Sequence, residues 1–131
     1  MKFGKIILYV ADVEASLAFY EKAFGLQTRT IREAGYGEVQ VGETTISFAS
    51  FETGQRHLPD GLTSAPASPS EVSVEIALVS DTVDDDFARA VEAGAQPLQH
   101  PELHPWGQTG SYLRTPDGTV IDLSSPATAW A

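Results

Sequence analysis

The sequence predicts an α+β domain made of two βαβββ modules, whose eight strands form a curved mixed sheet around a cleft with the helices outside. Three observations predict it. A strand pattern leads directly into a helix pattern near the N-terminus, and the same succession returns about seventy residues later. After each helix, short alternating segments are separated by turn signals, as expected for consecutive strands.

The first module is expected at about residues 1–51. Residues 3–10 alternate as a half-buried strand does, and residues 13–24 place apolar side chains at helical spacing. Asp12 is a suitable N-cap for this helix and Gly25 a suitable stop. Three further strands are predicted at residues 27–31, 37–41 and 44–50.

A linker is expected at about residues 52–70, where proline and glycine are frequent and no periodicity persists. It fits an exposed connector or a flap over a site. The second module is expected at about residues 71–125, with a strand at 72–79 and a helix at 83–93. Three more strands are predicted at residues 97–100, 110–114 and 119–124, with a tight turn at Pro116-Asp117-Gly118.

The two halves align with one another. Residues 44–48 correspond to residues 119–123, so that Ser47 corresponds to Asp122. Two half-sheets related in this way can curl together and leave a concave surface, which predicts the functional site in the cleft between them.

Composition narrows the range of partners. The net charge is −10 and no Lys/Arg cluster offsets it, which argues against nucleic acid and anionic membranes as partners. No apolar run is long enough to predict a membrane-spanning helix, and no signal-peptide pattern is present, so a cytoplasmic location is expected. The absence of cysteine removes disulfides, thiolate metal sites and a cysteine nucleophile.

Four segments carry a resemblance to a known family. They are ILYVADVEASLAFY at residues 7–20, FARAVEAGA at 87–95, PWGQ at 105–108 and RTPDGTVIDL at 114–123. Together they resemble the vicinal oxygen chelate superfamily of glyoxalases, bleomycin resistance proteins and extradiol dioxygenases. The resemblance implies the fold, but no single activity, because the superfamily includes lyases, isomerases, dioxygenases, thiol transferases and non-catalytic drug binders.

In metal-dependent relatives, two histidines and two glutamates from the first and last strand of each half hold the metal. The resemblance places Lys5, Ser47, Glu75 and Asp122 at these positions, with Ala49 as an alternative to Ser47. Strand alternation puts all four on one face. A protonated lysine has no lone pair and serine is a poor ligand, so we predict no metal site and no cofactor. A divalent metal held by Glu75, Asp122 and waters is the alternative.

The same positions predict a polar floor to the cleft, in which Lys5 neutralises Glu75 or Asp122. Tyr9, Trp106 and Tyr112 fit stacking on a planar guest, and equally fit core or dimer contacts. His57, His100 and His104 are predicted as surface loop residues, and Trp130 as part of a docked tail.

The leading functional prediction is a metal-independent small-molecule-binding protein similar to bleomycin resistance proteins, which sequesters a drug or metabolite and acts as a homodimer. Lys5, Tyr9, Ser47, Trp106 and Tyr112 would contact the ligand. The alternative is a glyoxalase-like lyase or isomerase, or a dioxygenase. In the lyase or isomerase, Glu75 or Asp122 is the catalytic base and Lys5 stabilises an enolate-like charge.

Overall fold

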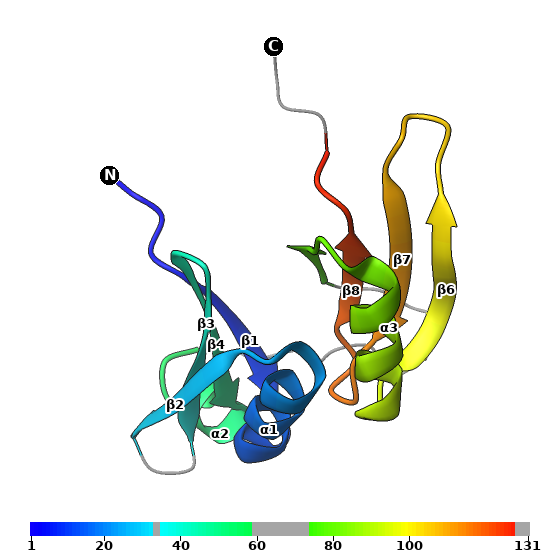
Figure 1. Cartoon of the computed structure of the whole chain (residues 1–131). Coiled ribbons are helices and arrows are strands. Elements are labelled where there is room, and N and C mark those ends of the chain that lie inside the picture. Colours follow the sequence, from blue (N-terminus) through cyan, green and yellow to red (C-terminus); the bar gives the residue numbers. More distant parts are fainter. Residues whose placement is uncertain (33–34, 59–73, 128–131) are drawn as a thin grey trace.

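The computed structural model describes residues 1–32, 35–58 and 74–127 (Figure 1). The first module contains two helices and a four-stranded sheet, here called sheet 1, in the order β1-β4-β3-β2. Its elements are β1 (Ile6–Val10), α1 (Val13–Phe24), β2 (Gln27–Arg32), β3 (Tyr36–Val41), β4 (Thr44–Ser50) and α2 (Phe51–Gln55). β1 runs parallel to β4, and the other pairs of neighbouring strands are antiparallel.

The second module repeats this topology in sheet 2, whose order is β5-β8-β7-β6. Its elements are β5 (Glu75–Val79), α3 (Val83–Glu92), β6 (Gln96–Leu103), β7 (Thr109–Arg114) and β8 (Val120–Ser124). β5 runs parallel to β8, as β1 does to β4. The outer strand β6 contains Pro97 and Pro101 and pairs irregularly with β7.

The predicted fold class is therefore confirmed, with differences in detail. The eight strands form two separate four-stranded sheets rather than one continuous sheet. β1 and β5 begin three residues later than predicted, and α2 occupies the start of the predicted linker. Most of that linker, and Trp130, lie outside the described residues.

Local signals account for the bounds of α1 and of the last hairpin. Asp12 caps α1 by accepting a hydrogen bond from the Ala15 amide at 3.0 Å, and Gly25 ends it with a φ of 66°. The predicted turn at residues 116–118 joins β7 to β8, and Gly118 has the positive φ, 96°, that favours glycine.

Each long helix buries its apolar face against its own sheet. Tyr20 of α1 packs against Phe48, with ring centroids 5.1 Å apart, while Phe87 and Ala90 of α3 are buried in the second module. Leu8 and Val10 of β1 are buried in the same core, which places Ile7 and Tyr9 on the opposite face of sheet 1.

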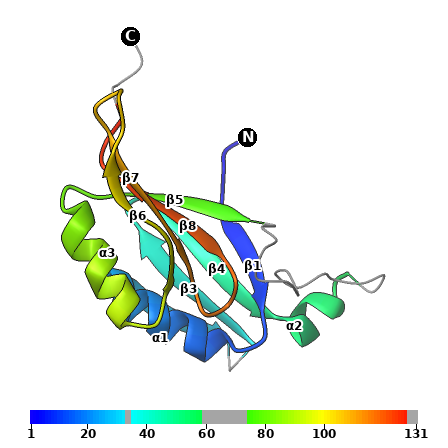
Figure 2. The ribbon, with the colours of Figure 1, turned by 90° about the vertical axis from the view of Figure 1, so that its right-hand side faces the viewer.

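The two modules meet mainly where α1 packs against α3, and both helices lie along the same side of the molecule (Figure 2). Two hydrogen bonds reinforce the junction. Nε of Arg89 donates to the Lys22 carbonyl oxygen at 2.9 Å, and the Ser16 hydroxyl donates to Asp117 at 3.0 Å.

Candidate functional site

Each sheet has one face covered by its long helix and a second face, here called the open face. On sheet 1 the strand register aligns Ile7, Ser47, Glu38 and Arg29 across the open face. On sheet 2 the equivalent row is Ala77, Asp122, Tyr112 and Gln99. The predicted correspondence of Ser47 with Asp122 is therefore present in the register of the two sheets.

The open face of sheet 1 is organised around Glu38, whose side chain is only 9% exposed. One carboxylate oxygen accepts from Arg29 through Nε at 3.0 Å and Nη2 at 2.8 Å. The other accepts from Lys5 Nζ at 3.3 Å and from the Tyr36 hydroxyl at 3.2 Å. Lys5 also donates to the Tyr36 oxygen, and Tyr36 is 2.9 Å from the fully buried Ser47 hydroxyl. The five side chains form a single hydrogen-bonded network.

This network shifts the pKa values of two of its members, Glu38 and Lys5. Burial alone would raise the pKa of Glu38, but the hydrogen bonds from Arg29, Lys5 and Tyr36 outweigh it and hold the pKa below its ordinary value. The hydrogen bond to Tyr36, followed by that to Glu38, raises the pKa of Lys5 despite partial desolvation. Lys5 is therefore a cation at neutral pH and has no lone pair to offer a metal.

The open face of sheet 2 has a different electrostatic character. Asp122 lies directly opposite Tyr112, and Glu75 lies two residues before Ala77, the neighbour of Asp122 on β5. The charge of Asp122, then burial, then the charge of Glu75 raise the pKa of Tyr112. No lysine or arginine within the described ranges forms an ion pair with either carboxylate. The Ser124 hydroxyl donates to Asp122.

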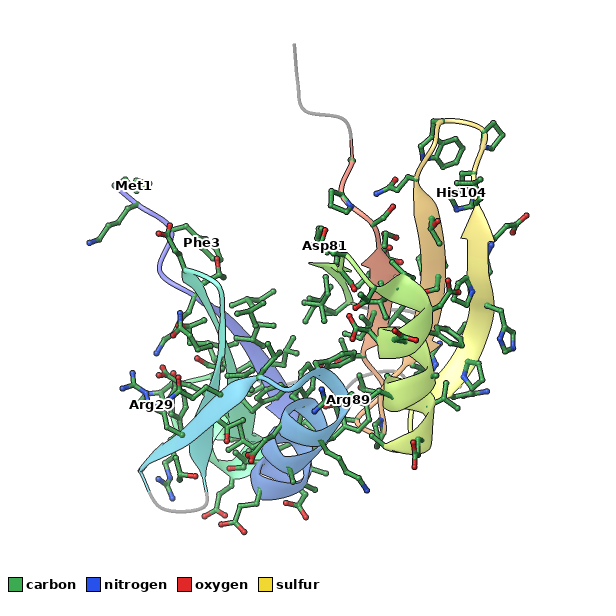
Figure 3. All side chains as sticks on the ribbon, viewed as in Figure 1. Met1, Phe3, Arg29, Asp81, Arg89 and His104 are labelled. Carbon is green, nitrogen blue, oxygen red and sulfur yellow. The ribbon has the colours of Figure 1, made fainter. Side chains whose placement is uncertain are left out.

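The loop between β6 and β7 adds an aromatic pair at the edge of this face. The His104 ring stacks on Trp106, with centroids 4.4 Å apart and planes 14° from parallel. A Cβ at Gly110 would come within 2.8 Å of His104 Nε2, so glycine is what allows the imidazole to lie there. His104 lies in the second module, whereas Arg29 of the sheet 1 network lies in the first (Figure 3).

The predicted site residues thus fall into two groups, one on each sheet. Lys5 and Ser47 are joined through Tyr36 on sheet 1, while Glu75, Asp122 and Tyr112 share the open face of sheet 2. The predicted pairing of Lys5 with Glu75 or Asp122 is wrong, because Lys5 pairs with Glu38.

Other aromatic and histidine predictions need adjustment. Tyr9 lies at the end of β1, where it lines a cavity beside Phe51. His100 belongs to strand β6 rather than to a loop, and its ring centroid lies 5.2 Å from that of Phe87. His104 is half-buried over Gly110 rather than a surface side chain.

Sequence reasoning missed Arg29, Tyr36 and Glu38. One signal was available, because Arg29 and Glu38 lie on consecutive predicted strands. The sequence did not give the register of these two strands, which is what places the two residues opposite one another. In the ranges 1–32, 35–58 and 74–127, no three His, Asp or Glu side chains are grouped so as to hold a metal ion. None of the helices described is long and apolar enough to cross a membrane.

The chain contains the same βαβββ module twice, which places it among proteins built from paired βαβββ modules. The family model for the Glyoxalase/Bleomycin resistance protein/Dioxygenase superfamily matches residues 2–123, and the chain belongs to this superfamily.

Solved structures show the same fold at low sequence identity. A glyoxalase-related enzyme from Fulvimarina pelagi superposes with a TM-score of 0.77 and 24% identity, covering 96% of this chain and 88% of the other. The hypothetical protein SA1046 from S. aureus gives 0.75 and 24%, covering 96% and 94%. A bleomycin-binding protein in complex with bleomycin gives 0.63 and 24%, covering 96% and 99%. No curated protein sequence matches the chain significantly.

Proposed function

We propose that the protein is a metal-independent small-molecule-binding protein of the glyoxalase/bleomycin resistance type, and that it sequesters a drug or metabolite bearing a positive charge. The observation that carries the proposal is the charge of the open face of sheet 2. Glu75 and Asp122 together raise the pKa of Tyr112, and within the described chain neither has a cationic partner. An organic cation would supply the missing charge.

Aromatic groups of the second module support a guest with a planar part. Tyr112 lies between the strands that carry Asp122 and Gln99, and Trp106 is 67% exposed at the tip of the adjacent loop. Aromatic faces attract cations as well as planar rings, so both parts of such a guest would find a partner here. A protein of the same fold binds bleomycin, which is consistent with the binding of a small molecule by this fold.

The chemistry of the side chains at the positions that hold the metal in metal-dependent relatives supports the proposal of metal independence. Lys5 is held protonated by Tyr36 and Glu38, and Ser47 is buried beneath the Tyr36 hydroxyl. Only Glu75 and Asp122 remain as anionic ligands, fewer than the three or four that a tight zinc or iron site requires.

We further propose that the working form is a homodimer. β1 and β5 are edge strands, and each carries an exposed apolar side chain on its open face. Ile7 is 41% exposed and Val79 is 68% exposed. The open face of sheet 1 presents Lys5 and Arg29, whereas that of sheet 2 presents two carboxylates. A second copy that apposes unlike faces would bury the apolar edges and enclose the ligand.

Ligand binding is tested by calorimetric titration of a panel of aromatic organic cations into the purified protein. The homodimer is tested by measuring the molar mass of the protein by light scattering. Replacing Glu75 with Gln and Asp122 with Asn together should weaken binding at least tenfold, the equivalent of about 1.4 kcal/mol. Glu43→Gln removes one charge in the exposed turn between β3 and β4 and should change affinity little. Equal losses in both variants would refute the proposed site.

One observation keeps an enzymatic role as the second candidate. Lys5 is held as a cation, which can stabilise an enolate, but it lies beside sheet 1, whereas Glu75 and Asp122 lie on sheet 2. Catalysis would therefore require a substrate that contacts the open faces of both sheets. Turnover of a ligand found by titration, lost in Glu75→Gln or Asp122→Asn while affinity persists, would favour the enzyme.

A further inference from the structure

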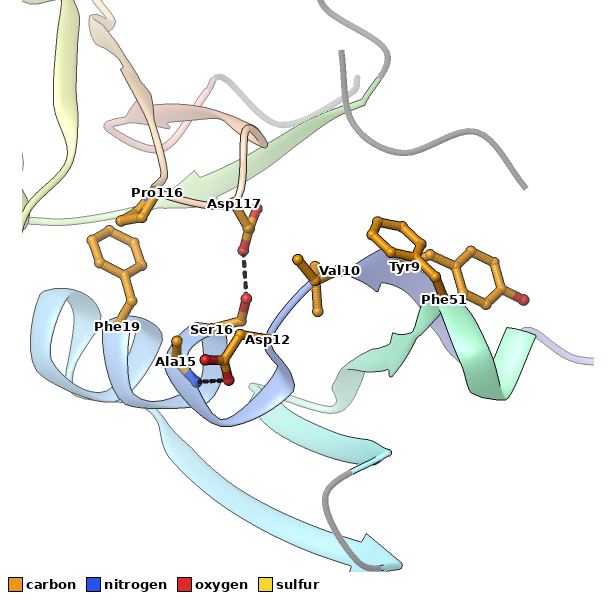
Figure 4. Close-up of a pocket in the computed structure, with 10 residues that line it drawn as sticks. Tyr9, Val10, Asp12, Ala15, Ser16, Phe19, Phe51, Pro116 and Asp117 are labelled. Atoms are coloured by element: carbon orange, nitrogen blue, oxygen red, sulfur yellow. Dashed lines mark hydrogen bonds between the residues drawn. The ribbon is translucent and has the colours of Figure 1, made fainter. Parts of the chain in front are cut away.

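A cavity of about 350 Å³ lies at the junction of the two modules, apart from the residues assigned above to ligand charge recognition. The end of β1, the first turn of α1, the first residue of α2 and the β7–β8 hairpin line it (Figure 4). Lys5, Glu75 and Asp122 are not among its lining residues. Its volume is within the range of small-molecule pockets, about 300–1,000 Å³.

The walls of this junction cavity are largely aromatic and aliphatic. Phe19 is presented from α1 beside Pro116, while Tyr9 and Phe51 lie together at the other end (Figure 4). Phe19 is held in place by edge-to-face contacts with Tyr20 and Phe24, at centroid distances of 5.6 and 5.9 Å. The cavity therefore offers ordered aromatic surface to an apolar guest.

Among the described residues, all the charge that lines the cavity is negative. The charged side chains are Asp12 and Asp117, and no lysine, arginine or histidine of the described ranges lines the cavity. Asp117 is occupied, because it accepts from Ser16 at 3.0 Å and from Thr119. Asp12 uses Oδ1 to cap α1, and Oδ2 has no hydrogen-bond donor within the described chain.

The α1 N-terminus opposes a cation here, but weakly. A helix dipole is equivalent to about half a positive charge at this end. The negative charge of two carboxylates exceeds this half charge. Asp12 also accepts a hydrogen bond from one of the free amide groups of the first turn. The balance of charge in the cavity therefore favours a cation.

We propose that the junction cavity is a second binding site, for a small primary ammonium compound with one aromatic ring. The ammonium group bonds Oδ2 of Asp12, and the ring packs against Phe19 of the first module and Pro116 of the second. Because the guest contacts both modules, its binding stabilises their relative arrangement and raises the unfolding temperature.

The test uses phenethylammonium as the probe and amide NMR chemical shifts as the readout. Titration should shift the amides of Ala11, Ala15 and Asp117, which line the cavity. Asp12→Asn retains the helix cap, because asparagine caps as well as aspartate, but removes the charge. It should weaken binding about fivefold, and neutral 2-phenylethanol should bind the wild-type protein about fivefold more weakly than phenethylammonium.

Two further variants make the result decisive. Ala15→Phe projects a ring into the cavity from an exposed helix position and should abolish the shifts. Glu14→Gln removes an equal charge from the same helix turn without lining the cavity and should retain the affinity. Equal weakening by Asp12→Asn and Glu14→Gln would overturn the proposal, as would shifts confined to the open face of sheet 2.

The two sites can fail independently. A protein carrying both Glu75→Gln and Asp122→Asn should lose the site proposed for sheet 2 and still show the shifts at the junction cavity. If that variant lost both sets of shifts, the junction cavity would not be a separate site.

Discussion

The open faces of the two sheets share one backbone plan and differ in their balance of charge. On sheet 1, buried Glu38 lies opposite Ser47, and Arg29 and Lys5 neutralise it. On sheet 2 the arrangement is reversed. The inner strand β8 carries the carboxylate of Asp122, and β7 carries the hydroxyl of Tyr112 opposite it. Duplication supplied equivalent positions. The side chains made the face of sheet 1 a satisfied network, whereas no described lysine or arginine pairs with the carboxylates on the face of sheet 2.

The largest effect on stability is expected for Ser47→Asp. This substitution places on sheet 1 the aspartate that sheet 2 has at the equivalent position, Asp122. Ser47 is fully buried opposite Glu38, so a second carboxylate there would meet a like charge without access to water. We expect a loss of about 3 kcal/mol in the free energy of unfolding, measured by urea denaturation.

The reciprocal change, Asp122→Ser, is its matched control. It removes one of two neighbouring negative charges from a partly exposed site and should change stability by less than about 1 kcal/mol. Similar losses from the two exchanges would show that the faces are not electrostatically different.

An intermediate effect is expected for Glu38→Gln, which leaves Arg29 and Lys5 without their carboxylate. Because Arg29 and Lys5 are 73% and 39% exposed, water compensates in part and we expect a loss of about 1–2 kcal/mol at pH 7. The pKa of Glu38 is lowered in the folded state, so its contribution is complete above the ordinary pKa and disappears as the pH falls through the lowered value.

The stability difference between wild type and Glu38→Gln should accordingly narrow in acid, below about pH 4. Denaturation curves recorded from pH 7 to pH 2 would check this. A difference that stayed constant with pH would mean that Glu38 stabilises the sheet by packing rather than by its charge.

The smallest effect on stability is expected for Asp122→Asn, within about 0.5 kcal/mol. Its informative result is spectroscopic. Because the charge of Asp122 is the main cause of the raised pKa of Tyr112, that pKa should fall toward its ordinary value. Titration of the Tyr112 ring carbons by NMR would measure this fall, and an unchanged pKa of Tyr112 would contradict it.

Much of the fold could be predicted because its signals are local. Helical spacing, the Asp12 cap and Gly25 define α1 from neighbouring residues alone, and the predicted bounds of α1 and β4 match the structure. The duplication also gave the equivalence of Ser47 and Asp122.

The remaining features depend on contacts between distant segments. A lone Glu38 in a strand gives no sign that Arg29 and Lys5 are its partners. Arg29 reaches it through the register of β2 with β3, and Lys5 reaches it from the N-terminal segment before β1. Likewise, the contact of α1 with α3, where the two modules meet, joins segments far apart in the chain, and neither helix sequence specifies it alone.

The two prolines of β6 protect the molecule from self-association along that edge. β6 is the outer strand of sheet 2, and Pro97 and Pro101 lack the amide hydrogen that an incoming strand would need. Its irregular pairing with β7 further disrupts the ladder of donors and acceptors that an added strand would have to match. Strand addition, and with it fibrillar aggregation, is thereby discouraged at this side of the protein.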